Sequence, residues 1–393
     1  MRMSWRAAIG LLAAFALAVP VPAAPRERPL PHFREHLITR DVPGGYQVVA
    51  VDLNRDGAID LIAVAQGMTD LVWFENPGWQ RHVIASNIPS MINLSPWDYD
   101  GDGRPELILA HGFDMDPHKS RGTISMLHSG TDVTAPWTVY KVDALPTSHR
   151  IRWADIDGSG KKVFIDAPLV GPNAVAPDYR DRVPLVYYKP GEWERRLIDE
   201  QEEGILHGLT IVNWLHNGRD QILTAGFSGI ALRALGTDGK WQRTAISKGD
   251  PAPWPKGGSS DVVPGHIGKE RFLAAIEPWH GHQVVVYREG KTGWTREVID
   301  TELQDAHTIA TVDLNGDGVD EIIAGARGTH NVCLYAFDGR TWEKSVLDDK
   351  MPAAGCAIAD LNGDGAPDIV CIGDGVLKWY ENMGEWAGKP QGR

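Results

Sequence analysis

The stretch that decides the fold is His307–Arg327, HTIATVDLNGDGVDEIIAGAR. It contains a short apolar segment (308–312), a carboxylate-rich turn (313–318) and a second apolar segment (322–326). Short apolar segments on either side of a turn rich in Gly, Asp and Asn predict two strands of one sheet. Similar turns occur at 52–57, 98–103 and 360–365, with a weaker copy at 155–160. The chain is therefore predicted to consist of repeats.

A second signal sets the number of repeats. An aromatic residue followed by a short alternating polar and apolar strand recurs seven times, with 46 to 58 residues between copies. The aromatic residues are Phe33, Trp79, Trp137, Trp193, Trp241, Trp294 and Trp342. Several short strands per repeat at this spacing predict the blades of a propeller, with each alternating strand at the outer edge. No sustained helical periodicity is present.

The order of the strands predicts how the ring closes. The chain begins with an outer-edge strand at Phe33, and its last strand, 376–380, has no outer-edge strand after it. We therefore predict an all-β fold, a seven-bladed β-propeller closed by the N-terminal strand completing the last blade. The predicted domains are a signal peptide at 1–24, the propeller at 25–384 and a disordered tail at 385–393.

The predicted location follows from the N-terminus. Arg2 and Arg6 precede an apolar run, 7–19, and small residues near 21–24 that suit a cleavage site, so we expect a secreted or periplasmic protein. No later segment is long enough for membrane insertion. The formal net charge of −13 argues against nucleic acid as a partner.

Three cysteines, Cys333, Cys356 and Cys371, are expected to be buried strand thiols. A Cys356–Cys371 bridge between neighbouring strands is the alternative.

The intact turns place side-chain oxygens at their first, third, fifth and ninth positions, as in the first part of a calcium-binding EF-hand loop. Ca²⁺ binding is therefore one prediction, and capping of backbone N–H groups is the other. The candidate ligands are Asp52, Asn54, Asp56, Asp60, Asp98, Asp100, Asp102, Glu106, Asp313, Asn315, Asp317, Glu321, Asp360, Asn362, Asp364 and Asp368. The turn resembles the FG-GAP/VCBS repeat, and this resemblance covers nearly the whole mature chain.

The histidines are distributed unevenly. His149, His207 and His307 each lie six residues before the first position of a turn, so they should occupy equivalent places at the start of an inner strand. Such strands line the channel of a propeller, and the three imidazoles are predicted to ring one mouth. Either they are structural, or together they hold a divalent metal or supply a general base.

Long loops on the same face carry further candidates. We predict catalytic roles for His149, His207, His307, Arg150 and Tyr179, because bases, an acid and a cation support proton abstraction next to a carbonyl. Residues predicted to bind substrate are Arg180, Glu277, Trp279, His280, Arg327, His330 and His111.

Segments 148–155, 167–172, 277–281 and 307–308 resemble the propeller domain of aldos-2-ulose dehydratase and related secreted sugar lyases. This resemblance implies a lyase or dehydratase that performs β-elimination on a keto-sugar or a uronate-containing saccharide. A non-catalytic, calcium-stabilised propeller that binds glycan or protein is the alternative, and a glycoside hydrolase is a weaker one because no clear carboxylate pair is present.

Overall fold

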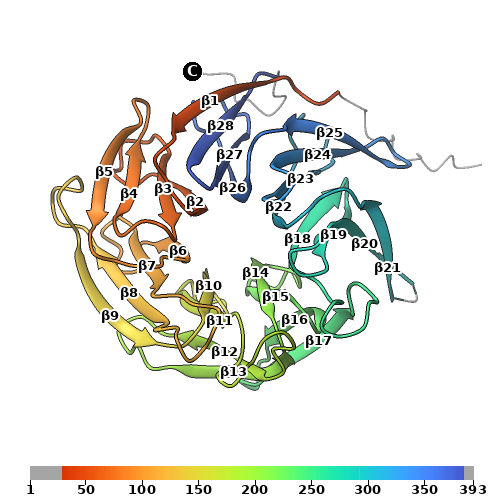
Figure 1. Cartoon of the computed structure of the whole chain (residues 1–393), viewed down its shortest axis with the longest axis horizontal. Helices are drawn as coiled ribbons and strands as arrows, with labels where there is room; N and C mark the ends of the chain where they lie inside the picture. The colour runs from red at the N-terminus through yellow and green to blue at the C-terminus, as the bar shows by residue number, and fades with distance from the viewer. Residues whose placement is uncertain (1–28, 292, 385–393) are drawn as a thin grey trace, which may run out of the picture.

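The computed structural model describes residues 29–291 and 293–384, so the segments predicted to be a signal peptide and a disordered tail lie outside the described residues. The described chain forms seven antiparallel four-stranded sheets arranged as a ring (Figure 1). No helix occurs among these residues, and none of them therefore forms a helical membrane span. The predicted seven-bladed propeller is confirmed.

Each of the first six blades is a run of four consecutive strands. The first three blades comprise β2 (Gly45–Val51), β3 (Asp60–Ala65), β4 (Leu71–Glu75), β5 (Gln80–Ala85); β6 (Asn93–Trp97), β7 (Glu106–His111), β8 (Thr123–His128), β9 (Thr138–Ala144); and β10 (Ser148–Ala154), β11 (Val163–Pro168), β12 (Arg182–Tyr188), β13 (Arg196–Glu203).

Blades four to six comprise β14 (Leu206–Val212), β15 (Gln221–Gly226), β16 (Gly229–Leu235), β17 (Trp241–Ser247); β18 (Asp261–Ile267), β19 (Glu270–Glu277), β20 (Gln283–Gly290), β21 (Gly293–Asp300); and β22 (Ala306–Val312), β23 (Glu321–Ala326), β24 (Asn331–Phe337), β25 (Trp342–Asp348). The predicted outer-edge strands are β5, β9, β13, β17, β21 and β25.

The seventh blade closes the ring. It contains β26 (Ala353–Ala359), β27 (Asp368–Gly373) and β28 (Val376–Asn382), and its outer strand is β1 (Phe33–Thr39). Strand β1 pairs antiparallel with β28, from Phe33 opposite Asn382 to Leu37 opposite Lys378. Figure 1 shows the first strand beside the last one, as the strand order predicts.

The hydrophobic core lies between adjacent blades. Trp73 of β4 is fully buried and shares one cluster with Leu94 and Leu107 of the second blade. Polar contacts also join the inner strands: the Gln47 amide bonds both the N–H and the C=O of Leu94, at 2.7 and 3.0 Å. Since each blade packs and bonds to its neighbours, the seven inner strands hold the side chains at the channel in fixed positions.

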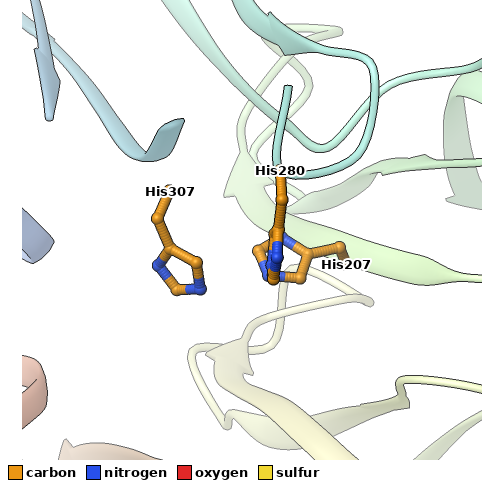
Figure 2. Close-up of side chains that lie close together, drawn as sticks. All are labelled: His207, His280 and His307. Carbon is orange, nitrogen blue, oxygen red and sulfur yellow. The ribbon is translucent and has the colours of Figure 1, made fainter. Parts of the chain in front are cut away.

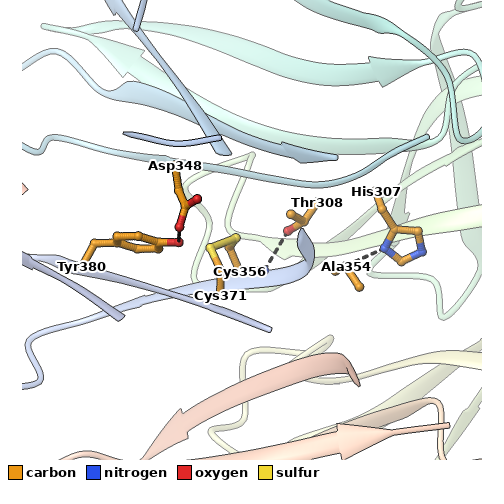
Figure 3. Close-up of a disulfide and its surroundings, with 7 residues drawn as sticks. All are labelled: His307, Thr308, Asp348, Ala354, Cys356, Cys371 and Tyr380. Atoms are coloured by element: carbon orange, nitrogen blue, oxygen red, sulfur yellow. Dashed lines mark hydrogen bonds between the residues drawn. A yellow bond between two sulfur atoms is a disulfide. The ribbon is translucent and has the colours of Figure 1, made fainter. Parts of the chain in front are cut away.

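The cysteine expectation was wrong for two of the three residues. Cys356 of β26 and Cys371 of β27 are directly opposite each other and form a disulfide, whereas Cys333 is a buried free thiol as expected. Cross-strand neighbours bring the two Cβ atoms close enough for a bond. Figure 3 shows that the disulfide joins β26 to β27, that Cys356 lies beside Thr308 of the sixth blade, and that Ala354 of the same inner strand contacts His307.

Candidate functional site

The site is built by a repeated irregularity of the inner strands. In five blades the register between the first two strands shifts at the second residue of the inner strand. The residues at these shifts are Tyr46, His149, His207, His307 and Ala354. An extra residue of this kind turns its side chain out of the regular alternation. The bulges thus direct a tyrosine and three imidazoles towards one end of the channel.

The imidazoles predicted at the mouth do gather there. The ring of His207 lies 4.9 Å from that of His149 and 5.0 Å from that of His307, measured between centroids. His280, from the loop after β19, adds a fourth ring 5.0 Å from both His207 and His307. Figure 2 shows His207, His280 and His307 pointing towards one another from three separate elements.

The predicted metal group of His149, His207 and His307 has a different membership in the structure. Nitrogen atoms of His207, His280 and His307 lie within 4.8 Å of one another and could hold a metal ion. His149 stands beside this group, and its Nε2 is bonded to the Tyr46 hydroxyl at 2.8 Å. His280 replaces His149 in the group because the loop after β19 crosses the mouth of the channel. The six-residue offset applies to inner strands only and therefore could not predict a histidine in a loop.

Hydrogen bonds define which nitrogens are free. His207 Nδ1 donates to the Ser260 carbonyl at 3.1 Å, and His307 Nδ1 donates to the Ala354 carbonyl. Each ring therefore carries its lone pair on Nε2. His280 Nε2 lies 3.3 Å from His207 Nε2 and is the donor there, because Arg327 Nη2 donates to His280 Nδ1 at 3.1 Å. His307 Nε2 is buried and has no hydrogen-bond partner among the described residues.

The imidazoles are neutral at pH 7. Burial holds the pKa of His149, His207 and His307 well below the usual value, and the nearby Arg150 charge acts in the same direction. Burial, with the Arg327 charge, lowers the pKa of His280 to about 3. Each uncharged ring already has a lone pair and can bind a cation without first losing a proton.

A second chain of contacts leads away from the metal group. Arg150 Nη1 donates to the Tyr46 hydroxyl at 3.3 Å, and this hydroxyl bonds His149. Tyr46 was missed by the sequence analysis, although it lies six residues before Asp52, the same offset as the three histidines. Repeat position, rather than residue type, was the signal that would have found it.

The other predicted residues divide into two sets. Trp279, Arg327 and Tyr179 lie near the mouth: the Trp279 ring is 4.5 Å from His280 and 6.2 Å from Tyr179. Arg327 pairs with Asp305 through Nε at 3.0 Å and Nη2 at 2.8 Å.

The structure does not bring the remaining predicted residues to the imidazoles. Glu277 accepts from Tyr287 at 2.6 Å and from Arg296 at 2.9 Å, within its own blade. Arg180 covers the Trp254 ring and pairs with Glu203, and His330 is exposed. His111 bonds Ser125 at 2.9 Å, and burial lowers its pKa to about 4.

The carboxylate turns cap backbone groups. Asp313 accepts from the N–H groups of Gly316 and Gly318 at 2.7 and 2.9 Å, and Glu321 accepts from Leu314 at 2.7 Å. Asp98, Asp100 and Asp102 of the second blade also bring carboxylate oxygens within 4.8 Å of one another. Oxygens of Asp100 and Glu106 lie equally close to a ring nitrogen of His128. Capping is therefore present, and acidic groups that could hold a cation occur in this turn.

The chain is a seven-bladed β-propeller, and parts of it resemble two known families. Residues 52–109 match the family model of the FG-GAP-like repeat, and residues 121–291 match that of the aldos-2-ulose dehydratase β-propeller domain. The chain is 24% identical over 412 residues to aldos-2-ulose dehydratase of Phanerodontia chrysosporium. That alignment covers 90% of this chain but only 45% of the relative, so the chain spans about half of its length.

Solved structures agree on the architecture. The WD40 propeller domain of Doa1 matches with a TM-score of 0.55 and 12% identity, over 90% of this chain and 99% of that one. A streptogramin B lyase structure matches with a TM-score of 0.56 and 13% identity, over 89% and 97%. Identities this low establish the fold alone.

Proposed function

We propose that the protein is a secreted lyase or dehydratase that performs β-elimination on a saccharide. The observation that carries the proposal is the convergence of two polar groups at one end of the channel: His207, His280 and His307, and the Arg150–Tyr46–His149 chain. The similarity to aldos-2-ulose dehydratase supports a sugar as the substrate. The signal-like N-terminus supports export.

His207, His280 and His307 suit a divalent metal. Backbone carbonyls hold Nδ1–H of His207 and His307, the arrangement that orients metal-ligating imidazoles. For His280 to bind the metal through Nε2, its proton would have to move from Nε2 to Nδ1, where Asp305 Oδ1 at 3.4 Å would accept it in place of the Arg327 donor. A bound divalent metal would supply Lewis-acid stabilisation of the oxyanion formed when the α proton leaves.

The Arg150–Tyr46–His149 chain suits proton transfer. Neutral His149 accepts the phenol proton of Tyr46, and Arg150 stabilises the phenolate oxygen that results. This oxygen then takes the α proton of the sugar. The C–H electron pair becomes the new C=C bond, the β C–O bond breaks, and the departing oxygen receives a proton from His149. The base is regenerated and no oxidant is required.

Aromatic side chains beside His280 provide a surface for a sugar ring. Trp279 and Tyr179 pack on an apolar cluster that includes Phe227 and Trp254. The faces of such rings bind the C–H groups of sugars, while polar neighbours bind the hydroxyls.

A non-catalytic saccharide-binding propeller is the second candidate. The burial of the imidazoles favours it, because His149, His207 and His307 are only 1–2% exposed. Buried neutral rings that bond backbone carbonyls would also serve to hold adjacent blades together.

The two candidate functions are distinguished by whether the protein converts a saccharide to product or only binds it. The protein would be incubated with keto-sugars and with uronate-containing glycans, and the absorbance of an unsaturated product followed. Tyr46→Phe and His149→Gln should each reduce the rate at least 100-fold, with His216→Asn as the control because His216 is exposed in a turn at the other end of its inner strand. Saccharide binding without any product, unchanged by these substitutions, would leave the binding candidate.

A further inference from the structure

Two arginines of β10 line the central channel. The channel holds a cavity of about 520 Å³ to which all seven inner strands contribute residues. Arg150 and Arg152 both face it, together with Tyr46 and His307 of the mouth. A cavity of this size suits a small sugar, since ligand pockets measure roughly 300–1,000 Å³. The channel is therefore continuous with the candidate site.

Neither arginine forms an ion pair. Within the part of the chain that the structure describes, no carboxylate oxygen lies within 4.0 Å of either guanidinium, and Asp261 acts on their charges only from a greater distance. Arg150 donates to the neutral Tyr46 hydroxyl, and Arg152 donates to Asn93 Oδ1 at 2.8 Å and the Ile151 carbonyl at 2.7 Å. Arg150 is 7% exposed, so its charge is largely removed from bulk water.

Another buried arginine of this protein has its charge neutralised by two carboxylates. Arg233 is completely buried between β15 and β17, and it pairs with Asp199 at 2.6 Å and Glu202 at 2.5 Å. Leaving a buried cation unpaired costs several kcal/mol on general grounds. The channel arginines thus differ from Arg233 because no carboxylate of the described chain lies at ion-pair distance. This is expected of a site in which a ligand supplies the carboxylate.

Asp261 is the acidic residue that acts on both arginine charges, but it forms no ion pair with either. It lines the same cavity, and burial raises its pKa although the Arg150 and Arg152 charges act in the opposite direction. Burial and the neighbouring Arg150 also lower the pKa of Arg152 to about 10. The lowered pKa of Arg152 agrees with two positive charges held close together in a buried channel, where Asp261 offsets them only in part.

We infer that Arg150 and Arg152 form an anion subsite in the channel that takes the carboxylate of an acidic sugar. The inference rests on the proposed function, because it names the substrate class of that site. A carboxylate held at Arg150 brings the adjacent α carbon next to Tyr46, which Arg150 contacts. Two guanidinium groups on the carboxylate would also stabilise the charge that forms there when the α proton leaves.

Binding tests the subsite without turnover. Calorimetric titration would compare galacturonate and glucuronate with galactose and glucose, with inorganic phosphate and sulfate as further arms. We expect each uronate to bind at least tenfold more tightly than its neutral sugar, and added salt to weaken this preference. Arg152→Gln should abolish the preference, Arg152→Lys should retain part of it, and Arg340→Gln, an exposed arginine, should leave it unchanged.

Several results would overturn the inference. One is equal affinity for uronates and neutral sugars; another is an undiminished preference in a folded Arg152→Gln variant. Tighter binding of inorganic phosphate or sulfate than of the uronates would show a site for another anion. Uronate binding without elimination would refute only the proposed function. Elimination of a neutral keto-sugar at the same rate in wild type and Arg152→Gln would refute only the subsite.

Discussion

Asp305→Asn tests whether His207, His280 and His307 bind a metal and whether Asp305 orients His280 for it. Asp305 pairs with Arg327, and its Oδ1 lies 3.4 Å from His280 Nδ1. It adopts a left-handed backbone conformation, φ 52°, which Asn also tolerates. The substitution therefore removes one charge and leaves the shape and the backbone in place.

The expected loss of metal affinity follows from the position of the Asp305 carboxylate beside His280. Groups that orient a metal-ligating imidazole change metal affinity by about 10- to 100-fold, or about 1.4 to 2.7 kcal/mol. The loss in folding stability should be smaller. Asp305 and Arg327 are 39% and 30% exposed, and partly exposed ion pairs contribute about 0.2–1 kcal/mol. Metal affinity and thermal stability should therefore separate in this variant.

The assay is a competition titration of Zn²⁺ or Co²⁺ against a chromophoric chelator, with thermal melts in parallel. His307→Ala should abolish tight binding, because it removes a ligand whose lone pair has no other partner among the described residues. Wild-type affinity in Asp305→Asn would refute the role of Asp305. No binding to the wild type, or equal binding to His307→Ala, would refute the metal site itself.

Three further predictions concern stability. The double substitution Cys356→Ala with Cys371→Ala removes the disulfide and should lower the free energy of unfolding by about 3 kcal/mol, the chain-entropy value for a 15-residue loop. Denaturant titration would measure this loss. As a control, the Cys333→Ala variant keeps the disulfide and should lose a similar amount of stability when a reductant breaks that bond. Burial raises the pKa of Asp166 to about 7, above its unfolded value, so the folded state keeps a proton that the unfolded state loses, and stability should fall as pH rises from about 4 to 7. The free energy of unfolding should therefore differ between pH 5 and pH 8, and Asp166→Asn should reduce this difference by about 2 to 3 kcal/mol. An unchanged difference would contradict the raised pKa of Asp166. Ca²⁺ should raise the melting temperature of the wild type more than that of Asp100→Asn, since Asp100 belongs to both acidic groups of the second blade. If neither Ca²⁺ nor a chelator changes the melting temperature, the turns only cap backbone groups.

Much of the architecture was predictable because it depends on patterns among residues that are close together in the sequence. Aromatic residues at regular spacing marked the outer strands, and carboxylates in the turns marked the junction of the first and second strands. The unpaired first and last strands predicted the pairing of β1 with β28. The common offset of His149, His207 and His307 predicted their convergence, since equivalent residues of a closed repeat must surround its axis.

The disulfide and the exact partners in the site were not predictable in this way. Cys356 and Cys371 became partners through the register of β26 and β27, and a shift by one residue would have turned them to opposite faces. His280 joined His207 and His307 because the loop after β19 crosses the mouth, and loop paths do not follow the repeat.

The amino-acid sequence by itself determined the blades, their number and their closure, because strand alternation and turn chemistry act between residues close together in the chain. Only the tertiary structure decided that Arg150 and Arg152 face the channel without an ion pair in the described chain, while Arg233 forms two. The physical reason is that desolvation and ion pairing depend on distances between blades. Those distances are fixed only when the ring closes and its inner strands pack around the channel.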